Sequence, residues 1–424
     1  MLDIQKKLTN SFFAILSLPA TAMGFALCVQ ISALSWILST KFNLDIHEVG
    51  FVWAAGPLAG IIGQILIGII SDKVWFWNGR RRPFILIGGT FAALSLLALP
   101  NIGVISDALG FEEVIGVAIM VALTLDLSIN ISFNPTRSII ADVTTESADR
   151  TKGYTWMQTI SGLFGVLAYV IGATFGNYSL IYFGIFLVLA FSIPPTLLVK
   201  EPRELDPIND PKEIEKSNSS TNTLELYKIY AAHGFCWLGI QTMFVYIFAY
   251  IKDAMAPITD DEIGQVIAIS FAVMNTVGFI LPVLVLQPLA ISIGRVKTHA
   301  ICMGIMALSY LAIVLTGQSP LVIYCLMAFV GVGWAAAVSL PFAIVTEQVD
   351  QKRMGYYMGI FNLSIVIPQL IVSFGFGTII QMAANKNIVF VISGATLAIS
   401  TVLWLLVKEY QKPSTSSTPS SGHH

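Results

Sequence analysis

Long apolar runs separated by short polar turns dominate the chain. Each run is roughly 20 to 28 residues long, the length that a helix needs to cross the hydrocarbon core of a bilayer. The runs predict twelve membrane-spanning helices, over residues 11–38, 48–71, 83–103, 113–140, 153–176, 179–199, 226–251, 263–291, 298–316, 320–346, 355–382 and 387–407. The pattern therefore predicts an all-α membrane protein.

The longest polar interruption divides the predicted helices into two sets of six. It covers residues 201–225, EPRELDPINDPKEIEKSNSSTNTLE, and its proline, serine, asparagine and charged residues are typical of a flexible linker. We therefore expect an N-terminal six-helix bundle over residues 1–200 and a C-terminal six-helix bundle over residues 226–410. Residues 411–424 predict a disordered polar tail, whose last residues resemble the remnant of a purification tag.

Similar loop sequences recur at equivalent positions in the two sets of helices. GRRR at 79–82 follows the second predicted helix, and GRVK at 294–297 follows the eighth. DRTKGY at 149–154 follows the fourth, and DQKRMGY at 350–356 follows the tenth. Paired sets of helices with matching loops are typical of a pseudo-symmetric transporter with a binding site between its halves.

Basic residues are distributed unevenly between the two ends of the predicted helices. Of the 23 lysines and arginines, Lys41, Lys252 and Lys386 lie in loops at one end, and Arg137 lies inside a helix. The other 19 lie near the chain termini and in the loops after even-numbered helices. Because basic loops remain in the cytoplasm, both termini are expected to be cytoplasmic.

Composition excludes several classes of protein. The chain is 55% hydrophobic and only 11% charged, whereas soluble domains contain about 25% charged residues. A net charge of −2 argues against a nucleic-acid partner. The four cysteines are scattered without metal-ligand spacing, and no nucleophile elbow or phosphate-binding glycine loop occurs. We therefore expect neither an enzyme nor a cofactor.

Three polar residues share one face of the fourth predicted helix. Asp126, Asn130 and Arg137 stand at positions i, i+4 and i+11, and eleven residues make about three helical turns. A charge at membrane depth costs about 2.5–3.5 kcal/mol on insertion scales, so such residues are usually functional and face a bundle interior. A carboxyl group that can take up a proton there would be the simplest proton-coupling element, which we assign to Asp126. The donors of Arg137 and Asn130 suit sugar hydroxyls or a coupling role.

Four stretches resemble one transporter family. FVWAAGPLAGIIGQILIGIISDK…GRRRPF (51–84) resembles the second helix and following loop of the major facilitator superfamily. This stretch, together with DLSINISFNPTRSIIAD (126–142), SLPFAIVTE (339–347) and GIFNLSIVIPQLIVS (359–373), is similar to the sucrose/proton symporters of plants and their animal and bacterial relatives. The sucrose/proton symporters belong to the broader glycoside–cation symporter group.

The resemblance implies specific roles for residues in these stretches. It implies the superfamily's fold of two pseudo-symmetric six-helix bundles, working as a monomer in the plasma membrane. The essential aspartate and arginine of the family would be Asp126 and Arg137. Gating is implied for residues at the cytoplasmic edge of the second helix, where the aspartate faces a helix N-terminus of the other half in the outward-open state: Asp72, Arg80, Arg81 and Arg82.

Other polar and aromatic residues inside the predicted helices are candidates for sugar binding. Sugar sites commonly combine polar groups that bind hydroxyls with an aromatic platform. The polar candidates are Gln30, Gln64, Gln158, Gln241, Asn362 and Gln369. The aromatic candidates are Trp53, Trp237, Trp334 and Phe133.

The leading hypothesis is a proton-coupled symporter that imports an α-glucoside disaccharide, maltose or sucrose, across a bacterial inner membrane. Sodium coupling, as in the melibiose branch of the glycoside symporters, is one alternative. A sodium site needs several oxygen ligands, whereas this chain has one firm carboxylate inside the membrane, so protons are favoured. A membrane sensor that transports nothing is the other alternative.

Overall fold

The computed structural model describes residues 3–61, 63, 70, 74–144, 147–202, 223–349 and 354–409. These residues are almost entirely helical, and the described part contains no strand beyond an isolated bridge between Phe76 and Gly79. The helices are α1 (Asp3–Lys6), α2 (Asn10–Thr40), α3 (Ile46–Trp53), α5 (Arg82–Ala98), α6 (Ile102–Leu109), α7 (Ile115–Val143), α8 (Ser147–Leu198), α9 (Thr223–Ala254), α10 (Asp260–Leu281), α11 (Gln287–Ile293), α12 (Arg295–Thr316), α13 (Pro320–Gln348), α14 (Met354–Ile371), α15 (Gly377–Met382) and α16 (Ile388–Leu405).

Within the described residues, ten helices are long and apolar enough to cross a membrane. One of them, Lys152–Leu198, is 47 residues long and covers two predicted helices, 153–176 and 179–199. The chain turns between these two at Gly176, whose φ of 83° and ψ of 164° interrupt the helix. Residues 62, 64–69 and 71 of the predicted helix 48–71, the linker residues 203–222 and the predicted tail 411–424 lie outside the described residues.

Two helices contain short π-helical segments that the apolar pattern did not predict. Pro282–Leu286 separates α10 from α11, and Val372–Phe376 separates α14 from α15. Prolines in or just before these segments remove a backbone donor, which favours such local changes in helical pitch. The structure therefore divides the predicted helices 263–291 and 355–382 into two pieces each.

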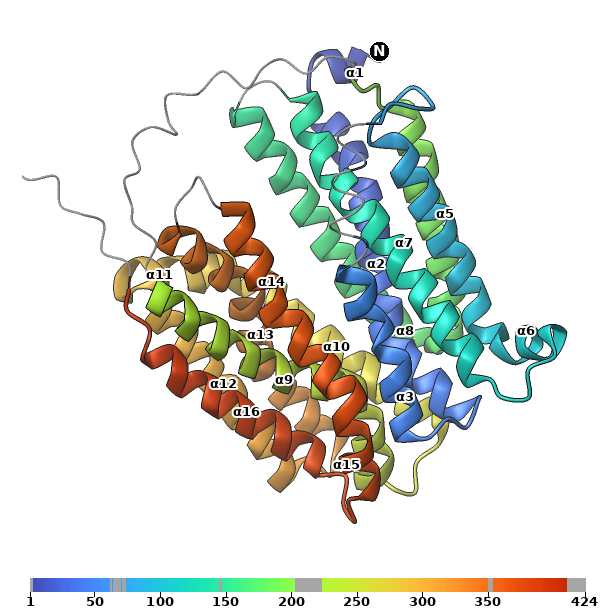
Figure 1. Cartoon of the computed structure of the whole chain (residues 1–424), viewed down its shortest axis with the longest axis vertical. Helices are drawn as coiled ribbons and strands as arrows, with labels where there is room; N and C mark the ends of the chain where they lie inside the picture. Colours follow the sequence, from blue (N-terminus) through green and yellow to red (C-terminus); the bar gives the residue numbers. More distant parts are fainter. Residues whose placement is uncertain are drawn as a thin grey trace, which may run out of the picture.

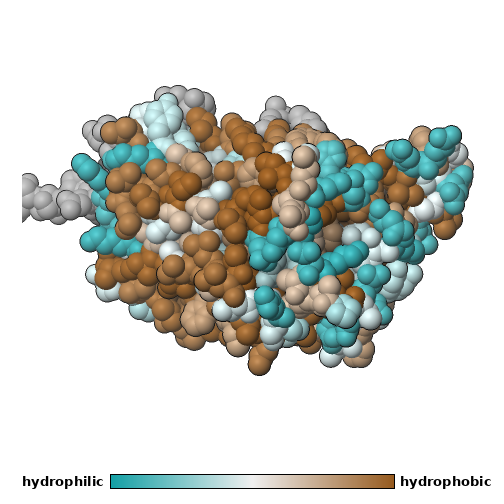
Figure 2. Space-filling model, turned by 90° about the horizontal axis from the view of Figure 1, so that it is seen from below, coloured by the Kyte–Doolittle hydropathy of each residue, from teal (hydrophilic) through white to brown (hydrophobic). Residues whose placement is uncertain are grey.

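The long helices form two groups. Figure 1 shows α2, α5, α7 and α8 together, and α9, α10, α12, α13, α14 and α16 beside them. The groups meet at the end where α3 and α15 lie, the α3–α15 end, and diverge toward the end that carries α1, the α1 end (Figure 1). Figure 2 shows hydrophilic residues gathered over part of the α3–α15 end, next to hydrophobic surface.

Small residues allow the helices inside a group to approach closely. A Cβ atom on Gly88 of α5 would lie 2.6 Å from the carbonyl oxygen of Ser128 on α7, too close for any side chain. Without a hydrophobic force between helices in lipid, such close van der Waals contact is a main source of association. It fixes α5 against α7, the helix that carries Asp126.

Hydrogen bonds join the two groups at the α3–α15 end. The Ser35 hydroxyl of α2 donates to the carbonyl oxygen of Val245 on α9 at 2.9 Å. The Gln381 amide of α15 donates to Asp45, immediately before α3, at 3.1 Å, and the backbone N–H of His47 donates to Gln381 Oε1 at 3.1 Å. These contacts hold the α3–α15 end closed in this conformation.

Candidate functional site

A cavity of about 300 Å³ lies between the two groups of helices. Its walls come from α2, α3 and α7 of one group, from residues 56–60 after α3, and from α9, α13 and α14 of the other group. This volume is at the lower end of the range typical of small-molecule sites. The cavity brings together the following residues that the sequence singled out: Gln30, Trp53, Asp126, Asn130, Phe133, Trp237, Gln241, Trp334, Asn362 and Gln369.

A buried carboxyl group forms part of one wall. Asp126 is 7% exposed, and its Oδ2 atom accepts a hydrogen bond from the Gln30 amide at 2.8 Å. Asn130 donates to the backbone carbonyl of Asp126 at 2.8 Å, one turn along α7. Within the part of the chain that the structure describes, the other amide atom of Gln30, Oε1, is buried without a hydrogen-bond partner. The wall thus contains a carboxyl group and a buried amide oxygen without a partner. Ionising the carboxyl group there carries a large desolvation cost.

The opposite wall combines amides with aromatic rings. Gln369 of α14 donates to Gln241 of α9 at 3.2 Å. The indole of Trp237 meets that of Trp334 edge to face, with ring centroids 6.4 Å apart. Phe244 extends this aromatic surface, because its ring lies 5.3 Å from the Trp334 ring. Amides beside indole rings are the combination that binds hydroxyl groups and apolar C–H faces together.

Trp53 is held at the junction between the groups. Its indole N–H donates to the Ser35 hydroxyl at 2.7 Å, and Ser35 in turn donates to the carbonyl of Val245 in the other group. A cavity side chain is therefore connected to the contact that closes the α3–α15 end. A relative movement of the two groups that breaks the contact between Ser35 and Val245 would leave Trp53 bonded to Ser35 within its own group.

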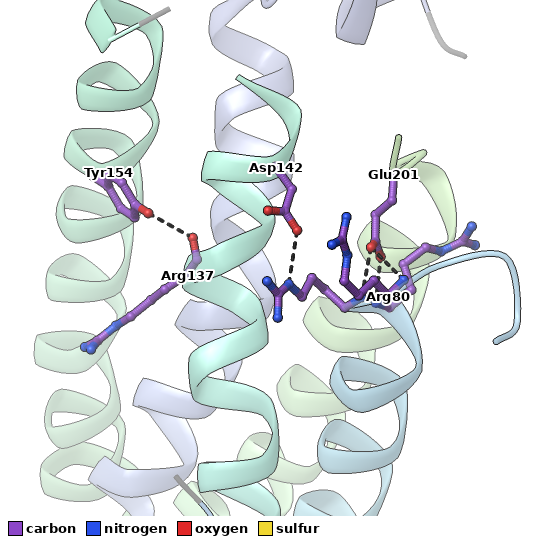
Figure 3. Close-up of polar contacts among 7 residues, drawn as sticks. Arg80, Arg137, Asp142, Tyr154 and Glu201 are labelled. Carbon is purple, nitrogen blue, oxygen red and sulfur yellow. Dashed lines mark hydrogen bonds and ion pairs between the residues drawn. The ribbon is translucent and has the colours of Figure 1, made fainter. Parts of the chain in front are cut away.

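Arg137 lies beyond the edge of the cavity. Its guanidinium carbon stands 4.3 Å from the ring centroid of Phe133, which does line the cavity, and its side chain is exposed. Figure 3 shows this side chain pointing away from Asp142, while the Tyr154 hydroxyl donates to the Arg137 carbonyl oxygen at 3.2 Å. The stacking on Phe133 is a cation–π contact. Arg137 is thus near the cavity but not part of its lining.

Two polar candidates remain, Gln158 and Gln64. Gln158 is exposed on α8 and does not line the cavity. Gln64 lies outside the described residues, as does Asp72 of the predicted gate.

The three basic residues of the predicted gate occupy the N-terminus of α5, at the α1 end. Glu201, just after α8, accepts the backbone N–H groups of Arg80, Arg81 and Arg82 at 2.8, 2.8 and 2.7 Å. The Arg81 guanidinium forms a buried ion pair with Asp142 of α7, with Nε and Oδ2 3.0 Å apart (Figure 3). A carboxylate at a helix N-terminus is stabilised by the unsatisfied N–H groups and the helix dipole. These contacts connect α5, α7 and α8 within one group.

An equivalent arrangement occurs in the other group. Glu409, after α16, accepts the backbone N–H groups of Arg295 and Val296 at 2.7 and 3.0 Å, at the N-terminus of α12. Arg295 also pairs with Glu347 near the end of α13. The acidic partners were not among the predicted site residues. The one local signal for them is that each lies just after a predicted helix, and this signal does not identify the group that each one binds: Asp142, Glu201, Glu347 and Glu409.

A larger cavity, of about 440 Å³, lies at the α3–α15 end. Asp45, Gln381, Asp253 and Lys386 line it, and all four are engaged in hydrogen bonds. Gln381 bonds to Asp45 across the two groups, whereas Lys386 bonds to Asp253 and Ala383 within its own group. The smaller cavity is the better candidate site, because it combines a buried carboxyl group, amides and indoles from both groups.

Comparison with known proteins agrees with this architecture. The family model described as Major Facilitator Superfamily matches residues 15–373 and 258–423. The chain belongs to the Major Facilitator Superfamily. Members of this superfamily are transporters and not enzymes, so the cavity between the groups is the expected place for a transported molecule. The described residues contain no group of three or more His, Cys, Asp or Glu side chains that could hold a metal ion.

Several relatives within the superfamily have names that state their cargo. The chain is 25% identical over 430 residues to the sucrose transport protein SUC4 of Arabidopsis thaliana, with 87% of this chain and 84% of that protein covered. It is 26% identical over 435 residues to the sucrose transport protein SUT2 of Oryza sativa subsp. indica, covering 87% and 86%. It is 32% identical over 139 residues to the general α-glucoside permease of Schizosaccharomyces pombe, covering 31% and 25%.

Solved structures of other superfamily members share the fold. The inward-open xylose transporter XylE from E. coli superimposes with a TM-score of 0.71 at 16% identity, over 95% of this chain and 97% of that chain. The nucleoside transporter NupG superimposes with a TM-score of 0.69 at 12% identity, over 95% and 100%. At these identities the likeness concerns the fold alone.

Proposed function

We propose that this chain is a proton-coupled symporter that imports an α-glucoside disaccharide, maltose or sucrose, by alternating access. The observation that carries the proposal is the buried carboxyl group of Asp126 in the cavity between the two helix groups, opposite amides and indoles. The names of the relatives, sucrose transport proteins and an α-glucoside permease, support the choice of cargo.

The proposed topology follows the apolar pattern and the basic loops. The chain crosses the plasma membrane, a bacterial inner membrane, twelve times with both termini in the cytoplasm. Residues 1–200 and 226–410 form the two six-helix bundles, and a monomer suffices because one chain supplies both walls of the cavity. The α1 end is then cytoplasmic, and the divergence of the groups toward that end means that this conformation faces inward (Figure 1).

Asp126 is the proposed proton carrier. A proton from outside neutralises its carboxyl group, which removes the desolvation cost of a buried charge and allows the loaded cavity to close. Release of the proton to the cytoplasm restores the charge, and Gln30 stabilises the carboxylate by the 2.8 Å hydrogen bond. Each proton supplies about 1.4 kcal/mol per pH unit and about 2.3 kcal/mol per 100 mV of membrane potential.

Arg137 is proposed to act at the cytoplasmic mouth of the cavity. It follows Phe133 by one helical turn, about 6 Å along α7 in the direction of the α1 end. It lies eleven residues after Asp126, about 16 Å along α7 and too far for a direct ion pair. Its guanidinium can donate hydrogen bonds to sugar hydroxyls as the sugar leaves the cavity.

Sugar binding is assigned to groups from both bundles. Gln30 and Asn130 on one side, and Gln241, Gln369 and Asn362 on the other, provide donors and acceptors for hydroxyl groups. The indoles cover the apolar C–H face of a glucosyl ring. Because a sugar would contact both bundles at once, its binding favours the closed cavity over the open ones, as alternating access requires.

The deciding experiment is uptake of radiolabelled maltose and sucrose into proteoliposomes, with and without an inward proton gradient. Wild type should accumulate one of these sugars only with the gradient. Asp126→Asn should lose gradient-driven accumulation and keep gradient-free exchange of labelled for unlabelled sugar. Asp107→Asn, an exposed aspartate on α6, is the matched control and should transport as wild type does.

Two results would overturn the proposal. Accumulation that follows a sodium gradient and ignores protons would assign the chain to the sodium-coupled alternative. No uptake of either sugar under any gradient, from protein that is folded in the liposomes, would exclude the α-glucoside assignment.

A further inference from the structure

A histidine outside the cavity contacts one of the cavity's indoles. His233 of α9 is fully buried, and its Nε2 atom accepts a hydrogen bond from the indole N–H of Trp237, one turn further along, at 2.9 Å. Trp237 lines the cavity, whereas His233 does not. The acceptor role requires the neutral imidazole with its proton on Nδ1.

The imidazole is held firmly by its other neighbours. It stacks on the ring of Phe361 with centroids 4.7 Å apart and an angle of 19° between the planes. Phe361 is itself fully buried, and Asn362, the next residue of α14, lines the cavity. The position of His233 is therefore fixed by α14 as well as by its own helix.

The Nδ1 atom of His233 indicates that this residue does more than fill space in the core. Nδ1 is buried and has no hydrogen-bond partner among the residues that the structure describes. A buried polar group without a partner is unfavourable, and an apolar side chain of similar volume would avoid that penalty. Stability alone therefore does not explain a histidine at this position, whereas an acceptor for Trp237 does.

The orientation of Trp237 determines the shape of the aromatic wall. Its ring meets Trp334 edge to face at an angle of 78°, and Trp334 meets Phe244 at the same angle. Rotation of the Trp237 indole about its side-chain bonds would change the angle between the Trp237 and Trp334 rings. The fit of a flat glucosyl face against these two rings depends on that angle.

We propose that His233 is a positioning residue for sugar recognition, which fixes the Trp237 indole through its N–H group and thereby sets the shape of the cavity's aromatic wall. The statement about sugar rests on the proposed function, whereas the contact between His233 and Trp237 does not. A wrong cargo assignment and a wrong positioning role therefore give different experimental results.

The first measurement is the NMR spectrum of the indole N–H groups in nanodiscs, without sugar. The chain has eight tryptophans, and the Trp237 signal is identified by its absence in Trp237→Phe. In His233→Leu, which removes the acceptor and keeps a bulky side chain, the Trp237 signal should shift and lose protection from solvent exchange. In His233→Gln, whose amide can place an acceptor where Nε2 lies, it should remain close to the wild-type position. A signal unchanged in His233→Leu would refute the contact.

The second measurement is transport kinetics with the sugar that wild type carries. His233→Leu should raise KM roughly fivefold, the change expected for losing about 1 kcal/mol of one hydrogen bond, with maximal rate within about twofold. His233→Gln should restore most of the affinity. In a Trp237→Phe background, His233→Leu should have no further effect on KM.

Each outcome decides one point. An indole signal that shifts without any change in KM would refute the positioning role and leave the proposed function intact. A fall in maximal rate with KM unchanged, or an equal effect of His233→Leu with and without the Trp237 indole, would also refute it. If wild type carries neither maltose nor sucrose, the proposed function fails while the indole signals still test the contact.

Discussion

Breaking the ion pair between Arg81 and Asp142 should destabilise the protein far more than breaking its counterpart in the other group. The side chains of Arg81 and Asp142 are only 8% and 9% exposed, whereas those of Arg295 and Glu347 are 42% and 38% exposed. Removing one partner of a buried pair costs about 3 kcal/mol or more, whereas an exposed pair contributes about 0–1 kcal/mol. Asp142→Ala and Glu347→Ala therefore form a matched comparison within one chain.

The assay is thermal unfolding of the purified protein in detergent, at one scan rate and one ionic strength. For a unit of 150–250 residues, 1 kcal/mol changes Tm by about 2–4 °C. Asp142→Ala should therefore lower Tm by about 6–12 °C, and Glu347→Ala by less than about 4 °C. High salt should abolish the small effect at Glu347 and leave most of the effect at Asp142, because a buried pair is screened less.

Double-mutant cycles separate the ion pair from other consequences of each substitution. The coupling energy between positions 81 and 142 should exceed that between positions 295 and 347 by at least about 1 kcal/mol. Equal Tm shifts for Asp142→Ala and Glu347→Ala, together with equal coupling energies, would refute the reasoning from burial.

Two further predictions concern the cavity and the closed end. Gln241→Leu removes an amide from the cavity wall and should raise the KM for sugar about tenfold. Gln158→Leu, outside the cavity, should leave KM within about twofold of the wild-type value. Equal effects of the two substitutions on KM in uptake assays would contradict the assigned site. Gln381→Ala removes two hydrogen bonds between the groups at the α3–α15 end. In a variant with all natural cysteines replaced by serine, it should increase labelling of Ala249→Cys, at a position only 4% exposed in the cavity of the α3–α15 end, by a membrane-impermeant maleimide. An unchanged labelling rate would argue against a latch.

The sequence predicted most of the residues that line the candidate site. It did not predict which of these residues contact one another in the cavity walls. Asp126, Gln30 and Trp237 were singled out because polar and aromatic residues inside apolar helices are costly or specialised. The bond from Gln30 to Asp126 joins residues 96 positions apart, and only the packing of α2 against α7 brings them together. Gln158 satisfied the same criteria as Gln241, yet it does not line the cavity, because its place on α8 depends on how that helix faces its neighbours.

The acidic partners of the predicted gate residues show the same limit more sharply. Glu201 accepts hydrogen bonds from backbone groups 119 to 121 positions away, and no local pattern identifies such a contact. His233, which contacts Trp237, is a lone histidine in an apolar stretch of the sequence. The i, i+4 spacing of His233 and Trp237 predicts that the two side chains are neighbours on one helix. The stacking of His233 on Phe361 of α14 could not be predicted in this way, because it joins two different helices.

The amino-acid pattern alone was enough for the local properties of this chain, above all the bounds of its helices. Hydropathy specified where helices begin and end to within a few residues, as α2 and α13 show against predicted spans 11–38 and 320–346. Helix boundaries are a local property because a bilayer requires each helix to satisfy its own backbone hydrogen bonds. The tertiary structure alone decided which polar faces meet, where π-helical segments interrupt α10 and α14, and which end of the protein is closed. Those features depend on contacts between helices far apart in the chain, whose packing energies no single segment contains.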